Sequence, residues 1–120
     1  MTKFEQDVTA CLKTLPIKYL GENTNEPITG LECDMIITHY KGREVKVAVE
    51  VNGVFHYARN SDDMRDMAEP LGRDVVKQRI LERRAGYKVL VVPYSHWYIL
   101  EDAQKAGYLR DCLELIINQQ

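Results

Sequence analysis

The sequence predicts an α/β protein in which a mixed β-sheet is flanked by helices. Residues 31–40 and 44–51 are apolar strands joined by a short turn, which indicates a hairpin. An amphipathic helix at 71–86 and an apolar strand at 87–93 follow. Because a helical crossover allows two strands to pair in parallel, a hairpin followed by this unit predicts a mixed sheet. We expect the order αβββαβα in one domain, residues 1–120.

The N-terminal segment predicts a helix that ends before Pro16. Thr2 is a suitable N-cap, and Glu5 lies three residues later, as in a capping box. Residues 17–20 form a short strand candidate, and 21–30 have the composition of a loop. The apolar residues of the helix recur at helical spacing: Phe4, Val8, Cys11, Leu12 and Leu15.

The last two elements predict how the sheet is completed. The strand at 87–93 is apolar at almost every position, which favours an internal position in the sheet. Residues 94–100 read as a loop, and Asp102 to Asn118 reads as a closing helix.

Composition limits the classes of partner. The chain is 45% hydrophobic and 28% charged with a net charge of −2, so nucleic-acid binding requires a local patch. No apolar run is long enough to span a bilayer, so we expect no membrane partner. Three widely spaced cysteines lack a metal-type pair, which favours free thiols in a reducing compartment: Cys11, Cys33 and Cys112.

Lys77 lies inside the apolar arc of the second helix, between Ile80 and Leu81 on a helical projection. Its aliphatic stem could extend along the apolar surface and leave the charge in water. Alternatively, its ammonium group meets buried carboxylates. Both interpretations are open at this point.

Two strand residues are the carboxylate candidates. Asp34 and Glu50 lie on the two strands of the hairpin, and Glu50 lies on the face opposite the valines of its strand. If both face the same way, they suit Mg²⁺ or Mn²⁺, and Glu5 could add a third carboxylate. Otherwise they are two solvated strand residues. His56 could be a general base or a ligand, or it could only hydrogen-bond within a loop.

An aromatic cluster follows the last strand. Trp97 is close in sequence to Tyr94 and Tyr98. These rings could pack at the core or its rim, or they could stack on an unpaired base.

Three segments together resemble the RAP domain, a module of many organellar RNA-processing proteins: VAVEVNGVFHYARN, LGRDVVKQRILERRAGYKVLVVPYSHWYIL and YLRDCL. The resemblance spans roughly residues 36–113 and depends on many elements that agree in order and spacing. The matching residues are Glu50, Val51, Asn52, Gly53, His56, Lys77, Ile80, Leu81, Gly86, Tyr87, Pro93, Tyr94 and Trp97.

The resemblance implies a PD-(D/E)XK nuclease-like fold, similar to very-short-patch-repair endonucleases. Asp34 then fits the strand aspartate and Glu50 fits the acid of the second motif. The lysine usually found two residues after the acid is Asn52 here, and Lys77 could replace it from the helix. An active enzyme of this fold would use Mg²⁺ or Mn²⁺.

The function implied first is RNA binding in mitochondrial or plastid RNA processing, maturation or ribosome assembly. The expected partner is single-stranded RNA, alongside a helical-repeat segment or ribosomal and RNP proteins. Three alternatives are an active metal-dependent endoribonuclease, a protein-interaction module and a DNA-nicking repair endonuclease. The expected nucleic-acid contacts are Asn52, Arg59, Arg65, Arg73, Arg84 and Trp97. The expected catalytic residues are Asp34, Glu50, Lys77 and His56.

Overall fold

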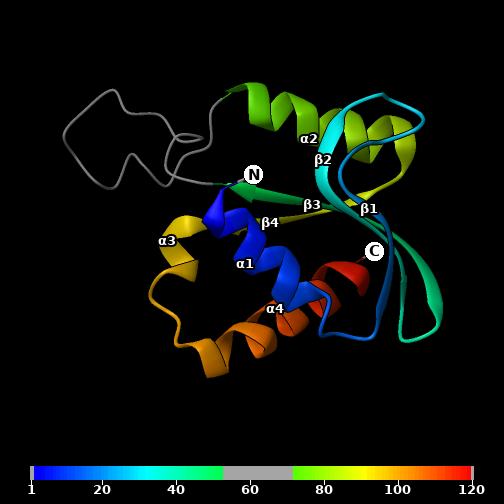
Figure 1. Cartoon of the computed structure of the whole chain (residues 1–120). Helices are drawn as coiled ribbons and strands as arrows, with labels where there is room; N and C mark the ends of the chain where they lie inside the picture. Colours follow the sequence, from blue (N-terminus) through cyan, green and yellow to red (C-terminus); the bar gives the residue numbers. More distant parts are fainter. Residues whose placement is uncertain (1, 53–71, 120) are drawn as a thin grey trace.

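A four-stranded sheet separates two layers of helices in the computed structural model, which describes residues 2–52 and 72–119 (Figure 1). The strand order is β1-β2-β3-β4, antiparallel except for the parallel pair β3 and β4. The sheet is therefore mixed, as the hairpin and the crossover predict. The strands are β1 (Ile17–Asn25), β2 (Glu32–Tyr40), β3 (Arg43–Asn52) and β4 (Lys88–Pro93).

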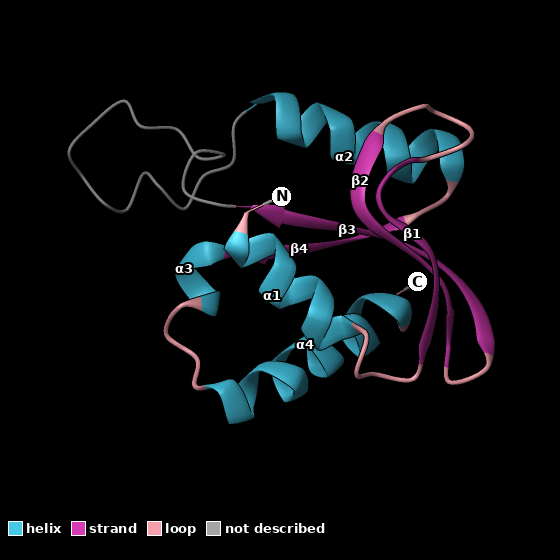
Figure 2. Cartoon of the chain, viewed as in Figure 1, coloured by secondary structure: helices cyan, strands magenta, loops and turns pink. Residues whose placement is uncertain are grey.

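The helices are divided unequally between the two faces of the sheet (Figure 2). One face carries α1 (Lys3–Leu12), α3 (Tyr94–Trp97) and α4 (Asp102–Ile117). The other face carries α2 (Gly72–Ala85), the crossover helix between β3 and β4. None of the helices in the described part is long and apolar enough to cross a bilayer.

The alternation of β3 creates both layers of the core. Val47, Val49 and Val51 are buried against α1 and α4 in the larger core. Ala48 points the other way and packs with Leu81 of α2 in the smaller core. Because successive strand residues face opposite sides, this pattern also directs Glu50 toward α2. The two faces predicted for β3 are confirmed.

The position of β4 corrects the sequence interpretation. Among the described strands β4 pairs only with β3, so it lies at the edge of the sheet rather than inside it. Leu90 and Val92 are buried in the larger core, and Val89 packs against the smaller one. The apolar character of β4 therefore reflects coverage of both faces by helices, which does not require a neighbouring strand on both edges.

Two boundaries also differ from expectation. Strand β1 continues to Asn25 through residues predicted as loop, because they pair with β2 in an irregular register. Asn23 has φ 47° within this stretch, a left-handed conformation that asparagine tolerates better than most residues. Residues 94–97, predicted as loop, form the short helix α3.

The N-terminus of α1 and the C-terminus of α2 follow the predicted capping, whereas α1 ends at Leu12, before the predicted end at Pro16. The Thr2 side chain accepts a hydrogen bond from the Glu5 backbone N–H at 3.1 Å. Gly86 follows α2 with φ 74°, the left-handed conformation of a C′ glycine. The Lys46 ammonium donates to the Ala85 carbonyl, which brings a positive charge to the C-terminus of α2.

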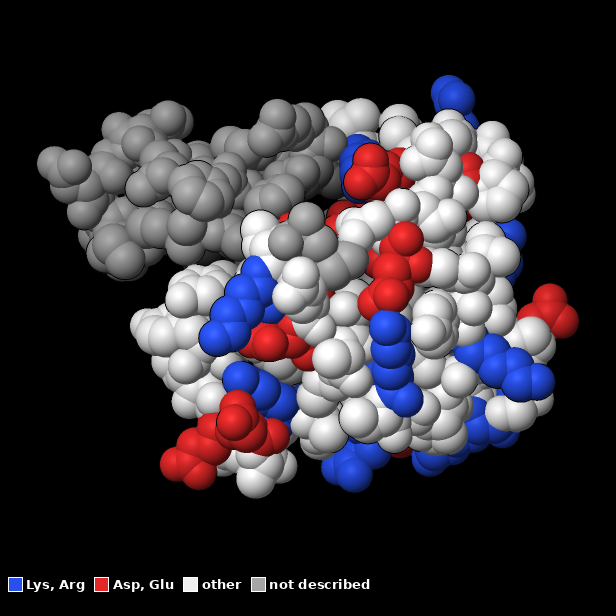
Figure 3. Space-filling view, in the orientation of Figure 1, with Lys and Arg blue, Asp and Glu red and all other residues white. Residues whose placement is uncertain are grey.

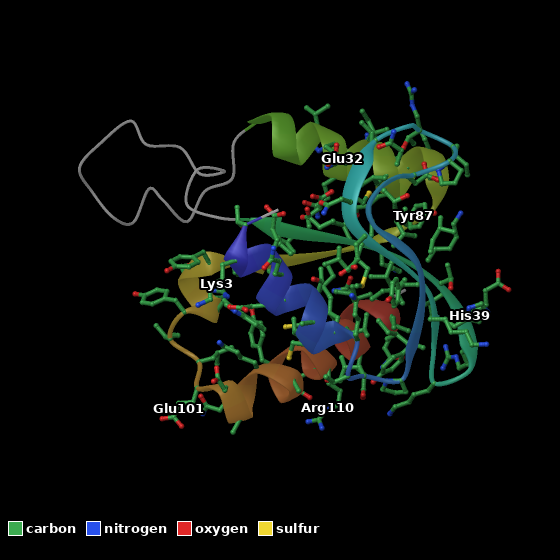
Figure 4. The ribbon with its side chains drawn as sticks, in the orientation of Figure 1. Lys3, Glu32, His39, Tyr87, Glu101 and Arg110 are labelled. Carbon is green, nitrogen blue, oxygen red and sulfur yellow. The ribbon has the colours of Figure 1, made fainter. Side chains whose placement is uncertain are left out.

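A buried carboxylate organises the turn between β1 and β2. Glu26 is fully buried and accepts from the backbone N–H groups of Ile28 and Thr29 at 2.9 and 2.6 Å. Its side chain also hydrogen-bonds to Tyr87, whose position after α2 is marked in Figure 4. Burial alone would raise the pKa of Glu26, but these hydrogen bonds lower it below its usual value of 4.5.

We expect Glu26→Gln to lower the free energy of unfolding by about 1–3 kcal/mol at pH 7, because an amide cannot accept all of these hydrogen bonds. A lowered folded-state pKa stabilises the fold fully above the usual value of 4.5 and progressively less as pH falls below it. The difference between wild type and variant should therefore shrink at pH 3, measured by urea unfolding. Exposed Glu32 is the control, since Glu32→Gln should change stability by less than about 0.5 kcal/mol at pH 7. An equal effect of both substitutions would contradict the assignment.

Candidate functional site

An ion pair joins the crossover helix to the sheet. The Lys77 Nζ lies 2.8 Å from the Glu50 Oε1, and the side chains are 28% and 17% exposed. Glu50 reaches α2 because it lies on the same face of β3 as Ala48. Lys77 therefore meets a carboxylate from the sheet, which is one of the two interpretations that its place in the apolar arc allows.

Asp34, on β2, lies near the same end of β3 as Glu50. Strands β2 and β3 are paired from Tyr40 opposite Arg43 to Met35 opposite Val49. Beyond them, the Asp34 Oδ2 accepts a hydrogen bond from the Val51 N–H at 2.7 Å. A side-chain carboxylate thus binds the main chain of the residue that follows Glu50. The hairpin register brings the two predicted acids to the same end of the sheet.

The pKa of the Cys33 thiol is affected by the charged residues near the α2 face of the sheet. Burial is the main cause that raises the pKa of its thiol to about 11. The negative charge of Glu50 raises it further, Lys77 opposes this, and Glu26 and Asp34 add smaller increases. The thiol is therefore protonated and unreactive at neutral pH, as expected for a cysteine that packs in the core.

The predicted third metal ligand does not join this group. Among the described residues, no cluster of three or more His, Cys, Asp or Glu side chains could hold a metal ion. Glu5 lies on α1, which packs on the face of the sheet opposite α2, so the expectation of a three-carboxylate site is corrected. Asp34 and Glu50 remain. Two carboxylates fit Mg²⁺ or Mn²⁺, because such ions also use waters and substrate phosphate oxygens as ligands.

Several predicted site residues lie outside the described residues. His56, Arg59 and Arg65 fall within 53–71. Asn52 ends β3 and Arg73 lies in the first turn of α2, but only their backbone is described. Their roles in binding or catalysis stay predictions.

Arg84 is exposed near the C-terminal end of α2. It lines a shallow surface depression with Val76, Arg79, Ile80 and Arg83. Arg84 is about 10 Å along the helix axis from Lys77, at 1.5 Å per residue. We call Arg79, Arg83 and Arg84 the arginine surface of α2; neither Lys77 nor Glu50 lines the depression that they border.

Trp97 is buried, which argues against its predicted contact with nucleic acid. Its side chain is 3% exposed in the larger core, next to Phe4 and Tyr108. The Lys105 Nζ lies 5.2 Å from the centre of the indole ring. A ring covered in this way cannot stack on a base, so Trp97 serves as a packing residue.

The surface charge is mixed. Lysine and arginine alternate with aspartate and glutamate over the visible face, without one large basic region (Figure 3). This agrees with the net charge of −2 and leaves local contacts to provide any affinity for nucleic acid.

Comparison with protein families identifies one match. The family model of the RAP domain matches residues 49–112, a range that includes Glu50 and Lys77, whereas Asp34 precedes it. No curated protein matches the chain. The family match indicates RNA binding with a role in RNA processing.

We expect Lys77→Met to lower the free energy of unfolding by about 1–3 kcal/mol, because it removes the ammonium that lies 2.8 Å from the partly buried Glu50 carboxylate. Adding Glu50→Gln should recover part of that loss, which urea unfolding of both single variants and the double variant would measure. Lys41→Met is the control, since it removes an exposed ion pair with Glu114 and should cost less than about 1 kcal/mol. Strictly additive effects at Lys77 and Glu50 would contradict a coupled pair.

Proposed function

Because the chain belongs to the RAP domain family, we propose that it is an RNA-binding domain with a nuclease-like core that acts in organellar RNA processing, maturation or ribosome assembly. The observation that carries this proposal is the family match over residues 49–112, which covers β4, α2 and both members of the Lys77–Glu50 ion pair. The family resemblance is the support for a mitochondrial or plastid location in this proposal, and free thiols suit a reducing compartment.

The expected ligand is single-stranded RNA, held by local contacts instead of bulk charge. The arginine surface of α2 supplies exposed cations for phosphate oxygens. The Lys77 charge is already balanced by Glu50, so its main effect is to hold α2 against the sheet. A helical-repeat segment or ribosomal and RNP proteins would be the protein partners of such a module.

A second candidate, a metal-dependent endoribonuclease, is favoured by the convergence of Asp34 and Glu50 at one end of the hairpin. Asp34 contacts the residue after Glu50, and Lys77 lies beside Glu50. Asp34 and Glu50 would hold Mg²⁺ or Mn²⁺, an ion that polarises phosphate and lowers the pKa of bound water. Lys77 would then lie next to the charge that develops on the phosphate. Asn52 in place of the motif lysine favours binding without cleavage.

A gel experiment separates these functions. We expect labelled single-stranded RNA to shift with the 120-residue chain, equally in EDTA, Mg²⁺ and Mn²⁺, and without cleavage. The complex should weaken as salt rises from 50 to 200 mM in the assay, because phosphate contacts release counterions. A double variant, Asp34→Ala with Glu50→Ala, and single-stranded DNA are run in parallel.

The outcomes point to different functions. Cleavage of RNA that requires a divalent ion and disappears in the double variant would replace the binding proposal with the endoribonuclease. Cleavage or nicking of DNA alone would indicate a repair endonuclease. Neither a shift nor cleavage would overturn RNA binding and favour a protein-interaction module. A circular dichroism spectrum of the double variant establishes whether it keeps the fold.

A further inference from the structure

Two exposed tyrosine rings are stacked at the end of the sheet. The ring centres of Tyr94 and Tyr98 are 5.3 Å apart, and their planes differ by 15°. Tyr98 is the C-cap of α3, and its N–H donates to the Tyr94 carbonyl at 3.0 Å. This single helical turn places residues four apart on the same side, so the backbone itself aligns the two rings.

The stack is anchored at one end and open at the other. Phe4 meets the Tyr94 ring edge to face, with centres 5.2 Å apart, and packs against the larger core. Tyr94 is 39% exposed, and Tyr98, the outermost ring, is 62% exposed. Tyr98 is therefore held by its neighbour on one face, while much of its remaining surface is in contact with water.

The location connects this stack to the rest of the site. Tyr94 directly follows Pro93, which pairs with Asn52 at the end of β3. Glu50 pairs with Val91 two positions earlier, so the tyrosines follow the same C-terminal ends of β3 and β4 at which the Lys77–Glu50 ion pair lies.

A cation lies near the stack. Lys3 is exposed and precedes Phe4 at the start of α1, in the vicinity of α3 (Figure 4). An aromatic platform beside a cation is the combination that single-stranded nucleic acid requires, one part for a base and the other for a phosphate. It also supplies affinity that the mixed surface charge does not.

We propose that the outer face of Tyr98 stacks on an unpaired nucleobase of single-stranded RNA, which extends the Phe4–Tyr94–Tyr98 series by one ring. This inference rests on the proposed RNA-binding function and adds a contact that the buried Trp97 cannot make. Because every base has an aromatic face, the contact tolerates different sequences but requires an unpaired base. Duplex RNA, whose bases are stacked on one another, should not use it.

The test uses the whole chain and a short single-stranded RNA that contains 2-aminopurine, a base whose fluorescence is quenched by stacking. We expect Tyr98→Ala to weaken binding between about 5- and 100-fold and to reduce the quenching, in line with the cost of losing one stacked base. Tyr98→Phe keeps the ring and should stay within about twofold of wild type. Binding of duplex RNA should be unchanged by Tyr98→Ala.

Tyr19 offers a matched control. It is 40% exposed on β1, at the other edge of the described sheet, and its ring centre lies 5.7 Å from the Lys13 Nζ. Tyr19→Ala therefore removes an exposed tyrosine beside a cation, and RNA binding should not change.

Each contrary result has its own meaning. Wild-type affinity and quenching in Tyr98→Ala would overturn base stacking while RNA binding stands. Equal loss in Tyr98→Phe and Tyr98→Ala would also overturn it, since the hydroxyl group would then carry the contact. Failure of the wild-type chain to bind any single-stranded RNA would overturn the proposed function and this inference together.

Discussion

The position of α2 against the sheet depends on two lysine contacts that run in opposite directions. Lys46 extends from β3 to the Ala85 carbonyl at the C-terminal end of the helix. Lys77 extends from the helix to Glu50 on β3, 2.8 Å away. Lys46 and Glu50 share one face of β3, so the same strand face holds the helix at two points. Leu81 and Ala85 fill the space between these contacts in the smaller core.

The Lys77–Glu50 pair carries a desolvation penalty that apolar packing does not. Removing an ammonium and a carboxylate from water is unfavourable, and their attraction often only offsets this loss. Replacing such a pair by apolar side chains of similar volume is often neutral or stabilising. The Lys77–Glu50 pair instead keeps the end of the α2 face beside Asp34 polar, next to the apolar residues of the smaller core.

The sequence predicts this part of the fold well where local periodicity determines it. The valines of β3 assign its two faces. The place of Lys77 among apolar residues marks it as unusual but leaves open whether its charge reaches water or a carboxylate, which the contact with Glu50 decides. Whether Asp34 and Glu50 meet depends on the register of β2 and β3, which a period of two residues does not determine. Pairing with β2 also determines the length of β1. It extends β1 to Asn25 through residues that have the composition of a loop.

Other features could not be predicted because they depend on distant contacts. Glu26 is buried only because the turn after β1 and Tyr87 after α2 surround it, and no spacing in the sequence connects them. Trp97 and Tyr98 are adjacent in the chain, but one is in the core and the other is exposed, because adjacent residues on a helical turn point about 100° apart. Aromatic composition alone cannot separate these two environments.

The layered structure also limits how RNA could reach the proposed contacts. The arginine surface belongs to α2 on one face of the sheet, and the tyrosine stack belongs to α3 on the other. The ends of β3 and β4 lie between them, with Glu50 close to that edge. An RNA strand that contacts both surfaces must therefore pass the ends of β3 and β4. There the Glu50 carboxylate would repel a phosphate group, and the Lys77 ammonium offsets this repulsion. The ion pair that holds α2 in place thus also makes this edge less unfavourable for an anionic ligand.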